Sequence, residues 1–337
     1  MALLAFLARR VLLAGLVLLG VSFGSFVFLA GKFNTICGPK THTLSATLPW
    51  YWRWLQGVPS RHSLTTSACG WPPLWPNLRP ALERTSALLA LAMAIVLVLG
   101  IALGILAAHT AGSVLDVALR AFSYVAWAIP AFLLALCLQW LFTWLGAAHG
   151  LHPFKLLGWP GFCPDPAHNP FDNDPTGNPP PTFDCPPAPH GLGYDLACLR
   201  YLALPAVSLA VGFVGSHSRH LRSSLLATLA APYVTTARAK GLSERRVLLR
   251  HALRVSLGTF VSAFLLDFGA IFGGALAVDW VFRMGGLGML FVNEITATAV
   301  DPYAVQLLLL VAATFVVASS LLAELGVIWL DPRARPT

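Results

Sequence analysis

Few residues of this chain have the types and spacing that enzyme chemistry requires. The six cysteines include no C-x-x-C pair, which a thiol–disulfide exchange centre would want, and their spacing fits no zinc pattern. No G-x-x-x-x-G-K-[ST] segment occurs, so the chain carries no phosphate-binding loop for ATP. The sequence therefore predicts no catalytic residue, no metal site and no cofactor bound by this chain.

The longest uninterrupted basic segment of the chain is 219–254. It holds eight bases against a single acid, Glu244. The bases are Arg219, Arg222, Arg238, Lys240, Arg245, Arg246, Arg250 and Arg254. In a soluble domain such a run would suggest nucleic-acid binding, so the composition of the surrounding chain decides what it means.

That composition indicates a membrane protein. Of 337 residues, 57% are apolar and only 11% are charged, whereas about a quarter of the residues in soluble domains are charged. So few charges cannot coat a soluble fold of this hydrophobicity. The net charge of +8 comes from bases at the ends of apolar runs, which favours membrane topology over nucleic-acid binding.

Six stretches are long and apolar enough, or nearly so, to cross a bilayer as helices, which takes roughly 20 residues each. They are 11–31, 86–108, 121–146, 201–218, 257–280 and 304–330. The first is too long for a typical signal peptide and has no clear cleavage site, so we interpret it as an uncleaved span. The predicted fold class is an all-α polytopic membrane protein with six transmembrane helices.

The basic segment also predicts the orientation. Positive loops stay in the cytoplasm, so 219–254 is predicted to be cytoplasmic, and an even number of spans places both termini there too. The organisation is then a first helix and external loop at 1–85 and a five-helix core at 86–330. The core contains an external loop at 147–200, and 331–337 form a cytoplasmic tail.

The external loops carry most of the cysteines. Cys37 and Cys69 lie in the first loop, and Cys163 and Cys185 lie in the second, away from cytoplasmic reductants. Disulfides 37–69 and 163–185 are the favoured pairs, with Cys198 as a competitor in the second loop and free thiols as the alternative. The aromatic residues at 50–54 suit either a segment in the headgroup region or a packed external cap.

The basic segment contains residues that typically begin and end helices. Pro232 suits the first turn of a helix, where its missing N–H is not needed, and Gly241 suits the residue just after a helix. Ser243 is then the expected N-cap of a second helix that begins with Glu244. A helix of about nine residues is unstable alone in water, so it needs a docking surface, and a soluble partner could supply one. The alternative is an ordinary solvated basic loop.

At this point the residues resemble a known family. Tyr233-Val234-Thr235-Thr236-Ala237-Arg238-Ala239-Lys240-Gly241-Leu242 is similar to the EAA loop of inner-membrane permeases of ABC importers, in the dipeptide/oligopeptide/nickel branch. The branch usually has Arg where Thr235 stands. The resemblance continues through 250–254 and covers most of the chain, including the first span. It implies the type I permease fold of ABC importers.

The resemblance implies a transport role without catalysis in this chain. Residues 233–242 would form the coupling helix, with Tyr233, Thr236, Ala237, Arg238, Ala239, Lys240, Gly241 and Leu242 coupling it to an ATPase. Two ATPase subunits or domains would bind ATP and Mg. A second homologous permease would complete the path through the lipid bilayer, and an extracytoplasmic solute-binding protein would deliver di- or oligopeptides. The location would be the cytoplasmic (inner) membrane of a prokaryote, with multi-pass topology.

One acid, Asp267, lies inside the fifth predicted span. An intramembrane acid is costly, so it either contacts the transport path or forms a structural hydrogen bond with a neighbouring helix. The main alternative function is an ion-gradient-driven secondary transporter, which would favour internal repeats and paired intramembrane charges. A membrane thiol–disulfide enzyme is a further alternative, which the missing C-x-x-C disfavours.

Overall fold

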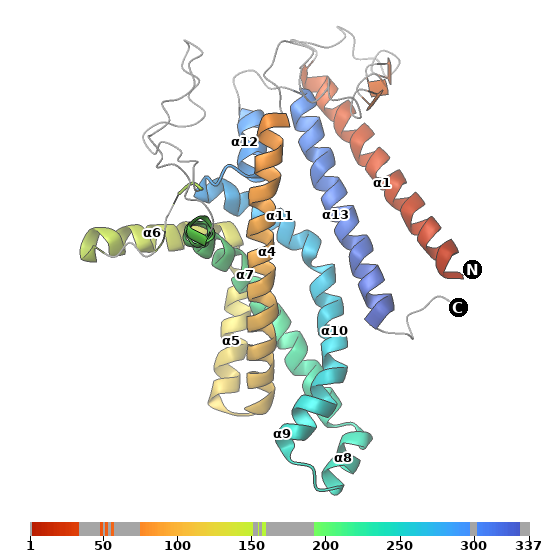
Figure 1. Ribbon diagram of the computed structural model, residues 1–337, viewed down its shortest axis with the longest axis vertical. Helices are drawn as coiled ribbons and strands as arrows, with labels where there is room; N and C mark the ends of the chain where they lie inside the picture. The colour runs from red at the N-terminus through yellow and green to blue at the C-terminus, as the bar shows by residue number, and fades with distance from the viewer. Residues whose placement is uncertain are drawn as a thin grey trace. The chain divides into compact units, whose positions relative to one another are not determined.

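The regular structure of the described chain is helical. The computed structural model describes residues 2–33, 48–49, 51–52, 55–56, 75–150, 154, 157–159, 192–296 and 302–330 (Figure 1). The helices are α1 (Ala2–Phe33), α4 (Trp75–His109), α5 (Val114–Ala128), α6 (Ala131–His149), α7 (Leu192–Leu229), α8 (Pro232–Ala239), α9 (Glu244–Arg246), the π-helical η1 (Val247–Ala252), α10 (Leu253–Leu266), α11 (Phe268–Phe282), α12 (Leu287–Thr296) and α13 (Pro302–Leu330).

Six of these segments are long and apolar enough to cross a membrane, as predicted. They are Ala8–Leu29, Asn77–His109, Ala131–His149, Cys198–Leu229, Glu244–Leu266 and Ala304–Gly326. A bent pair, α11 and α12, would add a seventh if it forms one broken span. The all-α polytopic class is therefore confirmed for the described residues. The cysteines at 37, 69, 163 and 185 and the tail at 331–337 lie outside those residues, so the disulfides stay a prediction.

Two predicted spans are not single helices. The stretch 121–146 is broken at Ile129 and Pro130, because the proline ring disfavours helical backbone at the residue before it, and Ile129 is extended with φ −86° and ψ 120°. Figure 1 shows α6 turning sharply away from α5 after this break. The stretch 257–280 is divided at Asp267, where α10 ends and α11 follows.

Two predicted loops are partly helical. The fourth span continues past 218 to Leu229, so Arg219 and Arg222 lie on α7 and not in a loop. The stretch between the last two predicted spans, 281–303, contains α12. The turn before α12 contains Gly285, whose φ of +70° is a conformation that glycine adopts without strain. Because no glycine or proline lies between Ser218 and Pro232, the helix continues beyond the apolar stretch, and apolar length alone underestimated α7.

The chain divides into two compact units. The first consists of Met1–Ser86, Leu157–Cys198 and Phe282–Ala318, and the second of Ala87–Leu156, Leu199–Val281 and Ser319–Thr337. In the first unit, buried Gln306 donates to the carbonyl of Ser22 at 2.7 Å, which joins α13 to α1. Tyr51 packs edge-on against Phe23 and Phe26, whereas Trp52 is exposed. Of the aromatic segment at 50–54, at least Tyr51 is therefore packed.

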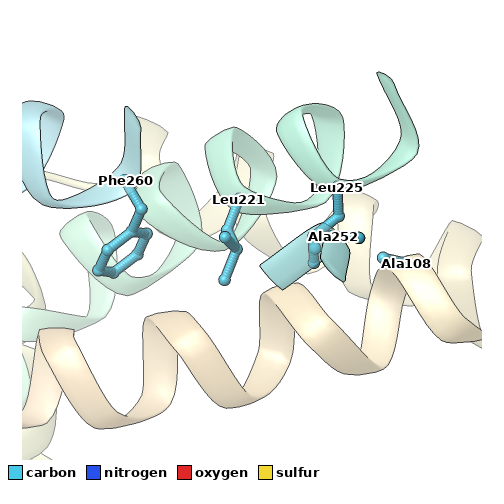
Figure 2. Close-up of a cluster of buried hydrophobic side chains, with 5 residues drawn as sticks. All are labelled: Ala108, Leu221, Leu225, Ala252 and Phe260. Carbon is cyan, nitrogen blue, oxygen red and sulfur yellow. The ribbon is translucent and has the colours of Figure 1, made fainter. Parts of the chain in front are cut away.

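The second unit has an apolar core where α4, α7, η1 and α10 meet. Figure 2 shows its five buried residues, with Leu221 and Leu225 on α7 directed toward α4. Ala108 comes from α4, Ala252 from η1 and Phe260 from α10. Each side chain is at most 5% exposed. This core holds the helices on both sides of the basic segment together.

Small residues let α5 and α7 approach closely in the same unit. A Cβ added to Gly215 would lie 2.8 Å from the carbonyl oxygen of Ser123, and one added to Gly212 would lie 3.3 Å from that of Ala126. Close backbone approach through glycine is typical of helix packing in membranes. Gly258 on α10 is different, since no atom of the described residues lies within 4 Å of an added Cβ.

These contacts predict opposite effects for two equal substitutions. Gly215→Ala should destabilise the protein by about 1–3 kcal/mol, because the methyl group meets a backbone atom that cannot move aside. Gly258→Ala should be neutral or stabilising by up to about 1 kcal/mol, because alanine favours helices. Thermal unfolding of the two purified variants in one detergent measures the difference. Equal midpoints would contradict the close α5–α7 crossing.

Candidate functional site

The basic segment folds as predicted into a short helix with clear ends. Pro232 begins α8, preceded by extended Ala231. The helix ends at Ala239, and Gly241 has φ +79° and donates to the carbonyl of Arg238 at 2.9 Å. Ser243 is the N-cap of α9, through its carbonyl and not its hydroxyl. The start and stop signals therefore did place the helix, to within one residue of its end.

One face of α8 packs within its own loop. Val234 is fully buried and Ala237 is 8% exposed, and both pack with buried Val247 at the start of η1. Leu229 and Leu242 cover this cluster at its edges. We call these five residues the loop core. Since eight residues cannot hold a helix alone, burial of this face is what stabilises α8.

The opposite face of α8 is exposed. It presents Tyr233, which is 47% exposed, together with Thr236, Ala239 and Lys240. Gly241 follows, also exposed. We call these five residues the outer face of α8. An aromatic ring, a hydroxyl and an ammonium group around small residues offer a contact surface with little steric obstruction.

A bidentate ion pair closes the loop. Arg238 donates to both carboxylate oxygens of Glu244, from Nε at 2.7 Å and from Nη2 at 3.2 Å, and Nη1 donates to the carbonyl of Leu229 at 3.4 Å. The hydrogen bond with Glu244 raises the pKa of the Arg238 guanidinium, which stays charged. Arg238 thus joins the end of α8 to the start of α9 and the end of α7. No sequence pattern indicated this internal pairing.

The loop core continues into the core of the second unit. Leu229 and Leu248 pack against the cluster of Leu221, Leu225 and Phe260, and Leu229 also belongs to the loop core. The junction is π-helical along η1, and such segments are frequent at functional sites. The packed side chains that support α8 are therefore continuous with those of α7, α10 and α4.

Asp267 lies where α10 gives way to α11. Its carboxylate is 36% exposed, and Oδ2 is 3.8 Å from Nδ1 of His217 on α7. His217 is fully buried against the rings of Phe260 and Phe264, and neither ring nitrogen makes a hydrogen bond in the described part of the chain. Asp267 therefore sits beside a second polar group within the span region and is half-open to its surroundings.

A second ion pair was missed by the sequence reasoning. Asp116, in the first turn of α5, is fully buried and accepts from Arg222 of α7 at 2.6 and 2.7 Å and from the N–H of Gly112 at 3.1 Å. The hydrogen bond from Arg222 holds the pKa of Asp116 below its ordinary value. The signal was an acid next to a helix N-cap at Ser113, opposite a base on a neighbouring span.

Comparison with known proteins agrees with this arrangement. Residues 100–336 match the family of binding-protein-dependent transport system inner membrane components. The match covers most of the chain and includes the basic segment with α8. The chain therefore belongs to this family, whose members are multi-pass inner-membrane components of transport systems.

Relatives within the family carry more specific names. The chain is 36% identical over 135 residues to the oligopeptide transport system permease protein AppB of Bacillus subtilis, which covers 40% of this chain and 42% of AppB. It is 36% identical over 103 residues to the oligopeptide transport system permease protein OppB of Escherichia coli, covering 31% and 34%. With OppB of Haemophilus influenzae the identity is 31% over 143 residues, covering 42% and 46%. The chain spans less than half the length of the curated relatives it matches.

The ion pair of α8 predicts a charge-swap rescue. Arg238→Glu and Glu244→Arg should each speed amide hydrogen exchange across 232–242 by about tenfold or more, because each places like charges opposite one another. The double variant Arg238→Glu/Glu244→Arg should restore the slow exchange. Arg245→Glu, on exposed α9, is the control and should leave exchange in α8 unchanged. Fast exchange in the double variant would show that Arg238 acts through some other contact.

Proposed function

We propose that this chain is a transmembrane permease subunit of an ATP-driven ABC importer that moves di- or oligopeptides across the cytoplasmic membrane. Three findings support the proposal: membership of the transport family, relatives named as oligopeptide permeases, and a short helix with one packed and one exposed face. The last of these carries it, because an exposed face on an internally supported helix suits docking to a soluble partner.

In this proposal the outer face of α8 docks into an ATPase. Tyr233, Thr236 and Lys240 make the contacts, while Ala239 and Gly241 allow close approach. Ala237 and Leu242 support the helix from below, and Arg238 acts as a positioning residue through Glu244. ATP and Mg are bound by two ATPase subunits or domains, and this chain performs no bond chemistry.

The packing of the loop core supports a transport cycle of the following kind. Closure of the two ATPases on ATP draws together the α8 helices of this chain and of a second homologous permease. The loop core passes that displacement to α7, α10 and α4. The spans then change from inward-facing to outward-facing as packed bodies, the kind of motion expected for alternating access. An extracytoplasmic solute-binding protein delivers the peptide to the outer side.

Removing the outer face should release the ATPase. Tyr233→Ala/Lys240→Ala should lower the amount of ATPase that co-purifies with the tagged chain by more than about tenfold, as loss of an aromatic anchor and a charge does at other interfaces. Membrane insertion and unfolding temperature should not change, since both side chains are exposed. Arg245→Ala removes an exposed base from the same loop and should retain the ATPase. Full recovery of the ATPase with the double variant would contradict docking on α8.

We further propose that Asp267 lines the transport path and pairs with the ammonium group of a peptide. Asp267→Asn should then lower uptake of a labelled dipeptide into cells by about tenfold or more, because a neutral amide cannot pair with that charge. ATPase co-purification should remain at the wild-type level. Unchanged uptake would assign Asp267 a structural role. A wild-type strain that takes up nickel but no peptide would contradict the peptide assignment itself.

A further inference from the structure

A ladder of charged and aromatic side chains runs between α5 and α7. Asp116, Arg120 and Tyr124 are spaced four residues apart on α5 and so share one face of that helix. Arg222 of α7 pairs with Asp116, and Arg219 of α7 lies over the ring of Tyr124 with its guanidinium carbon 4.4 Å from the ring centroid. The two helices run antiparallel along this ladder, since Trp127 also meets Phe213.

The ladder holds more positive than negative charge. Its three guanidinium groups face one carboxylate, Asp116, whose two oxygens are already taken by Arg222 and the N–H of Gly112. Arg120 Nε is 3.6 Å from Asp116, beyond hydrogen-bonding distance, and the contact of Arg219 within the described chain is with the ring of Tyr124. Among the described residues, Arg120 Nε and Arg219 Nη1 are buried atoms without a hydrogen-bond partner.

Such an arrangement favours a bound anion. Buried guanidinium donors without partners are costly, and two positive charges in excess raise that cost. Guanidinium groups match phosphate oxygens in geometry and bind them with short, charge-assisted hydrogen bonds. Arg222 is held in place by Asp116, so Arg120 and Arg219 are the groups with donors to offer. Arg120 is 43% exposed, which leaves the site open to an incoming group.

The surroundings select an amphiphilic anion. The neighbouring α5 surface is apolar and exposed, with Val117, Phe122 and Val125 each about half-exposed or more. The ladder lies near the start of α5 and the end of α7, which we predict to be at the cytoplasmic side. Basic sites between helices at that side of a membrane are suited to anionic lipid headgroups. A free anion would use the arginines and leave the apolar surface unused.

We propose that Arg120 and Arg219 form a binding site for the phosphodiester headgroup of an anionic phospholipid, with its acyl chains along the exposed face of α5. Asp116 and Arg222 position the ladder by fixing α5 against α7, and Tyr124 orients Arg219. The bound lipid stabilises the α5–α7 pair. The site does not depend on which cargo the protein carries or on the docking of an ATPase.

The test uses the purified full chain in nanodiscs of phosphatidylcholine, with and without phosphatidylglycerol. The wild type should unfold at a higher temperature with phosphatidylglycerol, and native mass spectrometry should find the lipid retained. Arg120→Gln/Arg219→Gln should lose that rise and retain the lipid roughly 30-fold less, since each base near a membrane surface contributes about 1 kcal/mol. Arg245→Gln/Arg246→Gln removes the same charge from exposed α9 and should behave as the wild type.

Further arms separate the possible anions and guard against misfolding. Inorganic phosphate at matched ionic strength in phosphatidylcholine should not raise the unfolding temperature, and an equal rise would assign the site to free phosphate and overturn the lipid proposal. No rise in the wild type, or the same rise in the double variant, would also overturn it. Should the double variant fail to fold, Arg120→Gln alone, at the more exposed position, should still weaken lipid retention. Unchanged retention there would count against the site.

Discussion

An eight-residue helix cannot persist in water unless it packs against something, and α8 packs against its own loop. Val234 and Ala237 are buried on Val247, with Leu229 shared between this loop core and the larger core of α4, α7 and α10. That shared leucine is decisive. Leu229 contacts both the side chains that stabilise α8 and those that pack α4, α7 and α10 together, so the packing of α8 is continuous with that of the spans. The outer face of α8 stays exposed because the apolar side chains of the inner face are already buried in the loop core.

Ion pairs add direction to this apolar packing. Exposed ion pairs contribute little to stability, so the role of Arg238 and Glu244 is geometric. Their bidentate bond holds the end of α8 against the start of α9, across the turn at Gly241. Asp116 and Arg222 do the same between α5 and α7, where glycines allow the backbones to approach. In both places a fork-shaped guanidinium group joins two separate helices.

Local rules predicted what depends on local sequence. Pro232 and Gly241 placed α8 because proline needs no donor and glycine tolerates positive φ, and apolar length indicated six spans without giving the bounds of each. The same rules missed the break at Asp267 and the extension of α7 to Leu229, since continuous hydrophobicity does not report where a helix bends. Partners in space were hidden as well. Asp116 and Arg222 are 106 residues apart, and no local pattern announces such a pair.

The resemblance to a family and the structure assign different roles to the same residues. The family motif treats 233–242 as one contact surface, yet helical geometry gives that segment two faces, and only one can meet a partner. Ala237 and Arg238 belong to the supporting side, because one is buried and the other is engaged by Glu244. In the proposed docking, such supporting residues matter as well as those that touch the partner, since a docking face must be held in place. The motif can therefore contain residues that support the helix as well as residues that contact a partner.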